Sequence, residues 1–126
     1  MGEPSLTEAN WQKPNGQTDA RGRTLQPIEL TTPSNYGTSN DVTLNDSQLT
    51  NFAAGYINFY TCNGVITIPK FNDHSADDYA FKTVQAYAGS RDIVQVDITG
   101  IASGGGGIHC VRDARVARVT TAAALV

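Results

Sequence analysis

The sequence has few of the features that mark secreted, membrane or nucleic-acid-binding proteins. Among 126 residues it holds two cysteines, Cys62 and Cys110, so two reduced thiols are favoured over a single disulfide. A net charge of −3 provides no positive field for nucleic acid or an anionic membrane surface. No segment approaches the roughly 18 consecutive apolar residues that cross a bilayer. Because the first residues show no apolar secretory core, we expect a cytoplasmic location.

The spacing of potential ligands argues against a metal or nucleotide site. Cys62, His74, His109 and Cys110 show none of the CxxC, HxxxH or HExxH spacings that hold zinc. His74 lies among acidic residues and is interpreted as a solvated loop histidine. The glycine run at 104–107 lacks the Lys-Ser/Thr ending of a phosphate-binding loop. The sequence therefore favours neither a zinc site nor a nucleotide site.

The first part of the chain, residues 1–51, is rich in glycine, proline, asparagine, threonine and serine. Its one convincing extended run is 24–30, which could be a strand remaining from a preceding structural unit. Residues 31–51 are polar throughout, and a loop of that length is unusual inside a compact domain. This stretch is either a functional loop or a segment whose packing partners are missing.

The second part of the chain is better patterned. Two runs rich in β-branched and aromatic residues, 56–62 and 65–69, flank Asn63-Gly64, and this pattern predicts a β-hairpin whose turn residues both accept positive φ. Alternation along the first run would place Asn58 between two aromatic side chains on one face of the strand.

A helix and a further strand are predicted to follow the hairpin. Ser75 is a candidate N-cap with Asp78 three residues later, apolar residues recur at helical spacing over 76–88, and Gly89 is a natural stop. Residues 92–98 then predict a strand. The resulting ββαβ unit gives an α+β fold, but it is too small to be stable without sister units. We divide the chain into a lead-in at 1–51, this module at 52–100, and a glycine-rich loop with a tail at 101–126.

Cys110 is the candidate nucleophile, because four glycines before it let the backbone approach a small ligand closely. Its neighbour His109 is not its expected base, since adjacent side chains of an extended segment point to opposite faces. The residues alone leave a second interpretation open, in which the glycines are a flexible connection and Cys110 is an inert strand cysteine.

Four segments together resemble the C-terminal part of agmatine deiminases, members of the peptidylarginine-deiminase-like family within the guanidino-group-modifying superfamily. They are Tyr56-Ile57-Asn58-Phe59-Tyr60, Asn63-Gly64-Val65-Ile66, Pro69-Lys70-Phe71-Asn72-Asp73 and Gly104-Gly105-Gly106-Gly107-Ile108-His109-Cys110. The upstream segment 19–25 is also similar to the family. The resemblance implies the pentein fold, a β/α propeller of repeated ββαβ modules, of which this chain would be one complete module plus part of a preceding one.

The resemblance also implies a chemistry. Cys110 would attack the guanidinium carbon of agmatine, release ammonia and leave an amidino-cysteine that water cleaves to N-carbamoylputrescine, a step of putrescine and polyamine biosynthesis. Asn58 and Gly107 would lie near the substrate, no cofactor or metal would be needed, and the chain could assemble as a homo-oligomer.

Two departures from the family pattern keep alternatives open. The family's general base and guanidinium-binding carboxylates lie in a Gly-His-x-Asp-type segment that this sequence lacks, so the chain would be roughly the last third of the enzyme and inactive by itself. The sequence after Cys110 also departs from the usual Thr/Gln-rich end. Peptidyl-arginine or free arginine are alternative substrates, and a catalytically silent paralogue that serves only as a binding or structural module is the alternative from a different class.

Overall fold

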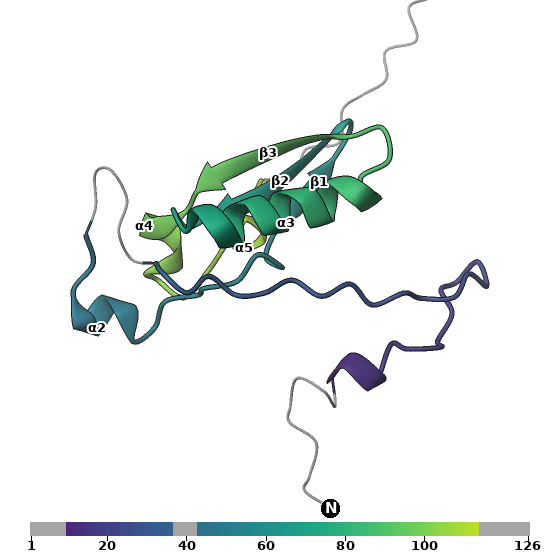
Figure 1. Cartoon of the computed structure of the whole chain (residues 1–126), viewed down its shortest axis with the longest axis horizontal. Coiled ribbons are helices and arrows are strands. Elements are labelled where there is room, and N and C mark those ends of the chain that lie inside the picture. Colours follow the sequence, from purple (N-terminus) through teal and green to yellow (C-terminus); the bar gives the residue numbers. More distant parts are fainter. Residues whose placement is uncertain (1–9, 37–42, 114–126) are drawn as a thin grey trace, which may run out of the picture. The chain divides into compact units, whose positions relative to one another are not determined.

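The computed structural model describes residues 10–36 and 43–113, which Figure 1 draws in colour. The chain divides into two compact units, Met1–Leu30 and Thr31–Val126. In the first unit, residues 10–12 form a helical turn, and Thr18 and Thr24 form an isolated antiparallel bridge. The predicted strand at 24–30 is wrong, because beyond Thr24 the run pairs with no other strand in the described residues and stays irregular.

The second unit contains a three-stranded mixed sheet in the order β1-β2-β3. The strands are β1 (Tyr60–Cys62), β2 (Val65–Lys70) and β3 (Asp92–Asp97). β1 and β2 are antiparallel, with Cys62 opposite Val65, so the predicted hairpin is confirmed. Of the two turn residues only Gly64 has a positive φ, 78°, contrary to the expectation for both.

The first hairpin strand is shorter than predicted, since residues 56–59 turn instead of extending. Tyr56 is buried, whereas Ile57 next to it is 76% exposed. Asn58 therefore does not belong to a strand face. Its side chain hydrogen-bonds to His109 and Cys110, as described below.

Helix α3 (His74–Tyr87) connects β2 to the parallel strand β3 and completes the predicted ββαβ unit. Its N-cap is Asp73 and not Ser75, because the Asp73 carboxylate accepts the backbone N–H of Ala76 at 3.2 Å. The helix begins two residues earlier than predicted. Beyond its C-cap Ala88, Gly89 has a φ of 65° and reverses the chain, as expected.

Helix α3 lies alongside the sheet (Figure 1), and its apolar side chains pack on the strands. Ile66 and Ile68 of β2 and Ala88 after the helix form the buried centre, and the partly buried side chains against it are Phe59, Phe81, Val84 and Ile93. A second, aromatic cluster lies where β2 leads into α3. Its ring contacts join Tyr36 to Phe52, Phe52 to Phe71, and Phe71 to Tyr56.

Within residues 43–113, three short helices complete the second unit. α2 (Asp46–Leu49) lies within the stretch predicted to be a polar loop and is closed by a capping box between Asn45 and Gln48. α4 (Thr99–Ala102) and α5 (Ile108–Val111) flank the glycine run. The predicted tail lies outside the described residues from 114 onward. Among the helices that the structure describes, none combines the length and apolar character needed to cross a membrane.

Candidate active site

The Cys110 thiol is free and exposed on α5. The expectation of an extended segment at this point is wrong, since residues 108–111 are helical. Successive side chains of a helix are about 100° apart and do not face each other. His109 instead lies beside the ring of Tyr60, with 6.5 Å between centroids, and its Nε2 is 3.3 Å from the Arg112 guanidinium.

The Asn58 side chain joins the hairpin segment to the cysteine loop. Its Nδ2 donates to the Cys110 Sγ at 3.2 Å, and its Oδ1 accepts the backbone N–H of His109 at 2.9 Å. A backbone N–H can only donate, so the carbonyl oxygen of the amide must face His109 and the NH₂ group must face the sulfur. The backbone therefore fixes which end of the amide meets the thiol.

Gly107 lies directly against this amide. A Cβ at this position would be 2.5 Å from the Asn58 Cγ and 2.7 Å from its Cβ, far inside van der Waals contact. Only glycine leaves room for Asn58, and the Gly107 carbonyl also accepts the backbone N–H of Cys110 at 3.1 Å. The three residues singled out in the sequence, Asn58, Gly107 and Cys110, are thus brought together.

Hydrogen bonding lowers the pKa of the Cys110 thiol below its ordinary value. The Asn58 amide makes the largest contribution and the Gly107 backbone the next, because donors aimed at sulfur favour the thiolate. The second thiol, Cys62, has a different setting at the end of β1, where it lies 3.6 Å from the Val65 carbonyl oxygen. A thiolate-favouring environment is the property that a nucleophilic cysteine requires.

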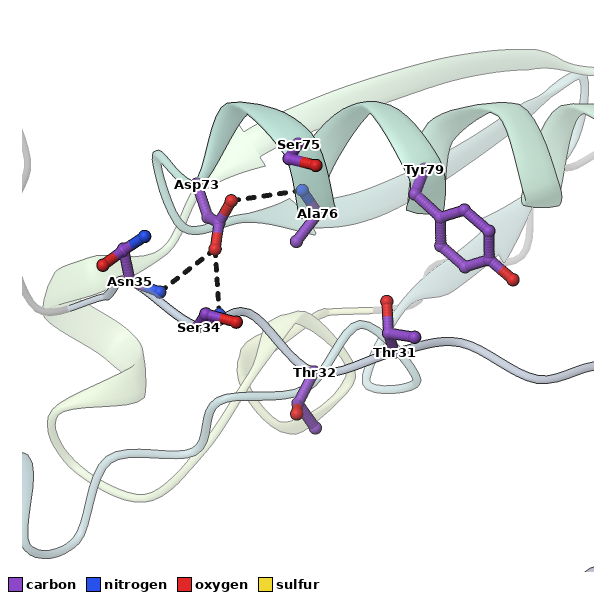
Figure 2. Close-up of a pocket in the computed structure, with 8 residues that line it drawn as sticks. All are labelled: Thr31, Thr32, Ser34, Asn35, Asp73, Ser75, Ala76 and Tyr79. Carbon is purple, nitrogen blue, oxygen red and sulfur yellow. Dashed lines mark hydrogen bonds between the residues drawn. The ribbon is translucent and has the colours of Figure 1, made fainter.

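A separate pocket of about 510 Å³ lies at the start of α3 (Figure 2). It is lined by Thr31, Thr32, Ser34, Asn35, Asp73, Ser75, Ala76 and Tyr79. None of the predicted site residues lines it. The Asp73 carboxylate at its edge already accepts three backbone N–H groups, from Ser34, Asn35 and Ala76, so it serves the fold (Figure 2). Residues 31–36 gave no sequence signal for this pocket, because it depends on contacts about 40 residues away.

Comparisons with known proteins identify relatives of this chain. The family described as Porphyromonas-type peptidyl-arginine deiminase matches residues 4–113. A Latilactobacillus sakei protein named "Putative agmatine deiminase" is 36% identical over 116 residues, covering 85% of this chain and 32% of its own length. A Streptomyces coelicolor protein of the same name is 35% identical over 96 residues, covering 76% and 26%.

A solved structure also matches this chain. The agmatine deiminase of Enterococcus faecalis superposes with a TM-score of 0.66 and 26% identity, covering 83% of this chain and 31% of that one. The chain thus spans about a third of the length of the relatives it matches. The match to the family covers the hairpin, α3, β3 and the cysteine loop. This chain belongs to the Porphyromonas-type peptidyl-arginine deiminase family.

Proposed function

We propose that this chain carries the nucleophilic cysteine of a deiminase that acts on a guanidino substrate, with agmatine as the first candidate. The observation that carries the proposal is the contact of the Asn58 amide with the Cys110 sulfur, in a space that only glycine at 107 leaves open. The names of the two relatives and of the Enterococcus faecalis structure support agmatine as substrate.

The proposed reaction has two steps. The Cys110 thiolate forms a C–S bond to the guanidinium carbon, one C–N bond breaks, and the leaving nitrogen takes up protons to depart as ammonia. Water then attacks the same carbon, the C–S bond breaks, and the thiolate returns with N-carbamoylputrescine as the product. This product would feed putrescine synthesis in the cytoplasm. The Asn58 amide favours the thiolate form of Cys110, and Gly107 allows the backbone to lie close to the reacting centre.

The three-stranded unit supports a wider architectural proposal. The ββαβ unit has a sheet of three strands, and the chain spans 26–32% of the length of the two relatives. Both facts fit a chain that carries one module of a pentein propeller. In this proposal residues 1–51 lead into the module at 52–100, and 101–126 carry the cysteine. The histidine and carboxylates that complete the site would come from other modules, and assembly into a homo-oligomer is compatible with this arrangement.

Labelling with 2-chloroacetamidine tests the cysteine, because this reagent presents an amidinium to a thiolate. We expect Cys110 to be alkylated at least about tenfold faster than Cys62 at pH 7, because hydrogen bonds to the Cys110 sulfur favour its reactive thiolate form. Mass spectrometry of tryptic peptides gives both rates, and Cys62→Ala and Cys110→Ala are the matched variants. Equal rates at the two cysteines would contradict the nucleophile assignment.

Ammonia release from agmatine tests the reaction itself. Turnover that disappears in Cys110→Ala and persists in Cys62→Ala would support the deiminase. The family description also names peptidyl-arginine, so a peptide with an internal arginine is the second substrate to assay. Selective labelling of Cys110 without turnover of either substrate would favour a chain that acts only with further residues, or as a silent binding module.

A further inference from the structure

Asn58 needs support from outside its own segment, because residues 57–59 belong to no helix or strand. One anchor precedes it, where the Ala53 N–H donates to the Ala102 carbonyl of α4 at 2.9 Å. The second anchor is Tyr56, which is 1% exposed and lies only two residues before Asn58. Two residues span at most about 7 Å of chain, so a shift of Tyr56 moves Asn58.

Tyr56 is held by a carboxylate on α3. Its hydroxyl donates to the Asp77 Oδ1 at 2.8 Å, and the same oxygen accepts the Phe71 N–H at 3.0 Å. The Phe71 ring also packs edge-on against the Tyr56 ring, with 5.2 Å between centroids. One oxygen therefore ties the segment before Asn58 to the end of β2 and to α3.

The other oxygen of this carboxylate has no evident structural use. Asp77 is 4% exposed, and its Oδ2 is buried with no hydrogen-bond partner among the residues that the structure describes. A buried carboxylate with an unsatisfied oxygen destabilises a fold relative to an apolar side chain of similar size. The Oδ1 contacts give this carboxylate a structural use, whereas no described residue hydrogen-bonds to its Oδ2.

We infer that Asp77, acting through the Tyr56 hydroxyl, is a positioning residue that holds the Asn58 amide against the Cys110 sulfur. The link runs from Asp77 to Tyr56, along two residues of backbone to Asn58, and from there to the thiol. In the part of the chain that the structure describes, neither Asp77 nor Tyr56 hydrogen-bonds to the Cys110 sulfur, so both act indirectly. The inference deepens the proposed function. It rests on that function only for the role of Cys110 as a nucleophile.

The test follows the alkylation of Cys110 by iodoacetamide against pH, in the full chain carrying Cys62→Ala. Tyr56→Phe removes only the hydroxyl. We expect it to slow alkylation at pH 7 by about fivefold and to move the rate profile to higher pH, because a displaced Asn58 no longer favours the thiolate. Asp77→Leu should act in the same direction, whereas Asp77→Asn keeps an acceptor oxygen and should retain the original profile.

Two controls separate positioning from loss of stability. Asp78→Asn removes the neighbouring carboxylate, which is exposed and paired with Lys82 at 2.6 Å, and should leave the profile unchanged. Ile68→Val weakens the core without touching the Tyr56 hydrogen bond, and it should lower the melting temperature without moving the profile.

A double-mutant cycle with Asn58→Ala decides the route. If Tyr56 acts through Asn58, Tyr56→Phe will slow alkylation no further once Asn58 is alanine. An unchanged profile in Tyr56→Phe, or an equal slowing in both backgrounds, would overturn the inference. Because alkylation requires no turnover, the absence of ammonia release from agmatine would bear on the proposed reaction alone and would leave this result standing.

Discussion

The contact between Asn58 and Cys110 requires a residue without a Cβ at position 107. A Cβ at Gly107 would overlap the Asn58 Cγ and Cβ together, so rotation of the short side chain cannot relieve the clash and the backbone must move. The adjacent Gly106 is different, because its Cβ would meet the Cys110 Cβ at 3.6 Å, an ordinary contact. Two neighbouring glycines thus offer a matched comparison.

We predict that Gly107→Ala slows alkylation of Cys110 at pH 7 by about fivefold, since loss of the amide donor raises the pKa of the thiol. Gly106→Ala should change the rate by less than about twofold, because ordinary van der Waals contact needs no rearrangement. Rates are measured in the Cys62→Ala background by mass spectrometry. Equal effects of the two substitutions would show that the whole glycine run, and not the space beside Asn58, sets the reactivity.

The sequence pointed to the three residues that the structure brings together, but not to the residues that hold them in place. The glycine run indicated Cys110, and the family resemblance added Asn58 and Gly107, because these residues lie in the short segments that carry the resemblance. The link between Tyr56 and Asp77 joins residues 21 positions apart through a tyrosine that alternation had assigned to a strand. No local pattern marks such a pair, since its geometry follows from how α3 lies on the sheet.

At the start of α3 the structure distinguishes between two candidate N-cap residues, Asp73 and Ser75. Asp73 accepts backbone N–H groups from Ala76 within the helix and from Ser34 and Asn35 outside it, whereas Ser75 already lies in the first helical turn. We predict that Asp73→Ala lowers the melting temperature by about 5 °C or more, as loss of an N-cap does in a domain of this size. Ser75→Ala should change it by less than about 2 °C. A larger loss for Ser75→Ala would restore the serine as the cap.

The same aspartate gives a pH dependence of known sign. The backbone N–H groups of Asn35, Ala76 and Ser34, in that order, lower the pKa of Asp73 in the folded state. Its contribution is therefore fully present above the ordinary carboxyl pKa and is lost as pH falls through the lowered value. The difference in melting temperature between wild type and Asp73→Ala should stay constant near neutrality and shrink at acid pH. A difference that grows on acidification would contradict this assignment.

The elements were predictable where local signals agreed. Gly64 and Gly89 mark the hairpin turn and the helix end, and the β-branched run at 92–97 forms β3. α2 was missed although Asn45 and Gln48 form a capping-box pattern, because its four residues carry no apolar periodicity. The run at 24–30 failed for the opposite reason, since β-propensity without a pairing strand does not make a strand.

For the molecule as a whole, all residues of the candidate site lie in the second compact unit. The five residues that form or support the site fall within Thr31–Val126: Asn58, Gly107, Cys110, Tyr56 and Asp77. The side-chain hydrogen bonds described above join them to residues of the same unit. The reactivity of the Cys110 thiol should therefore not depend on residues that make none of these contacts.

We therefore predict that removal of residues 1–30 leaves the alkylation rate of Cys110 at pH 7 within about twofold of the full chain, because additivity holds for parts without shared partners. The comparison uses iodoacetamide in the Cys62→Ala background, with circular dichroism to verify that the shortened chain retains its sheet and helix. Asn58→Ala in the shortened chain is the matched control and should slow alkylation as much as it does in the full chain. A folded shortened chain with a slow, Asn58-independent thiol would show instead that the first unit shapes the site, and the proposed chemistry would then have to include it.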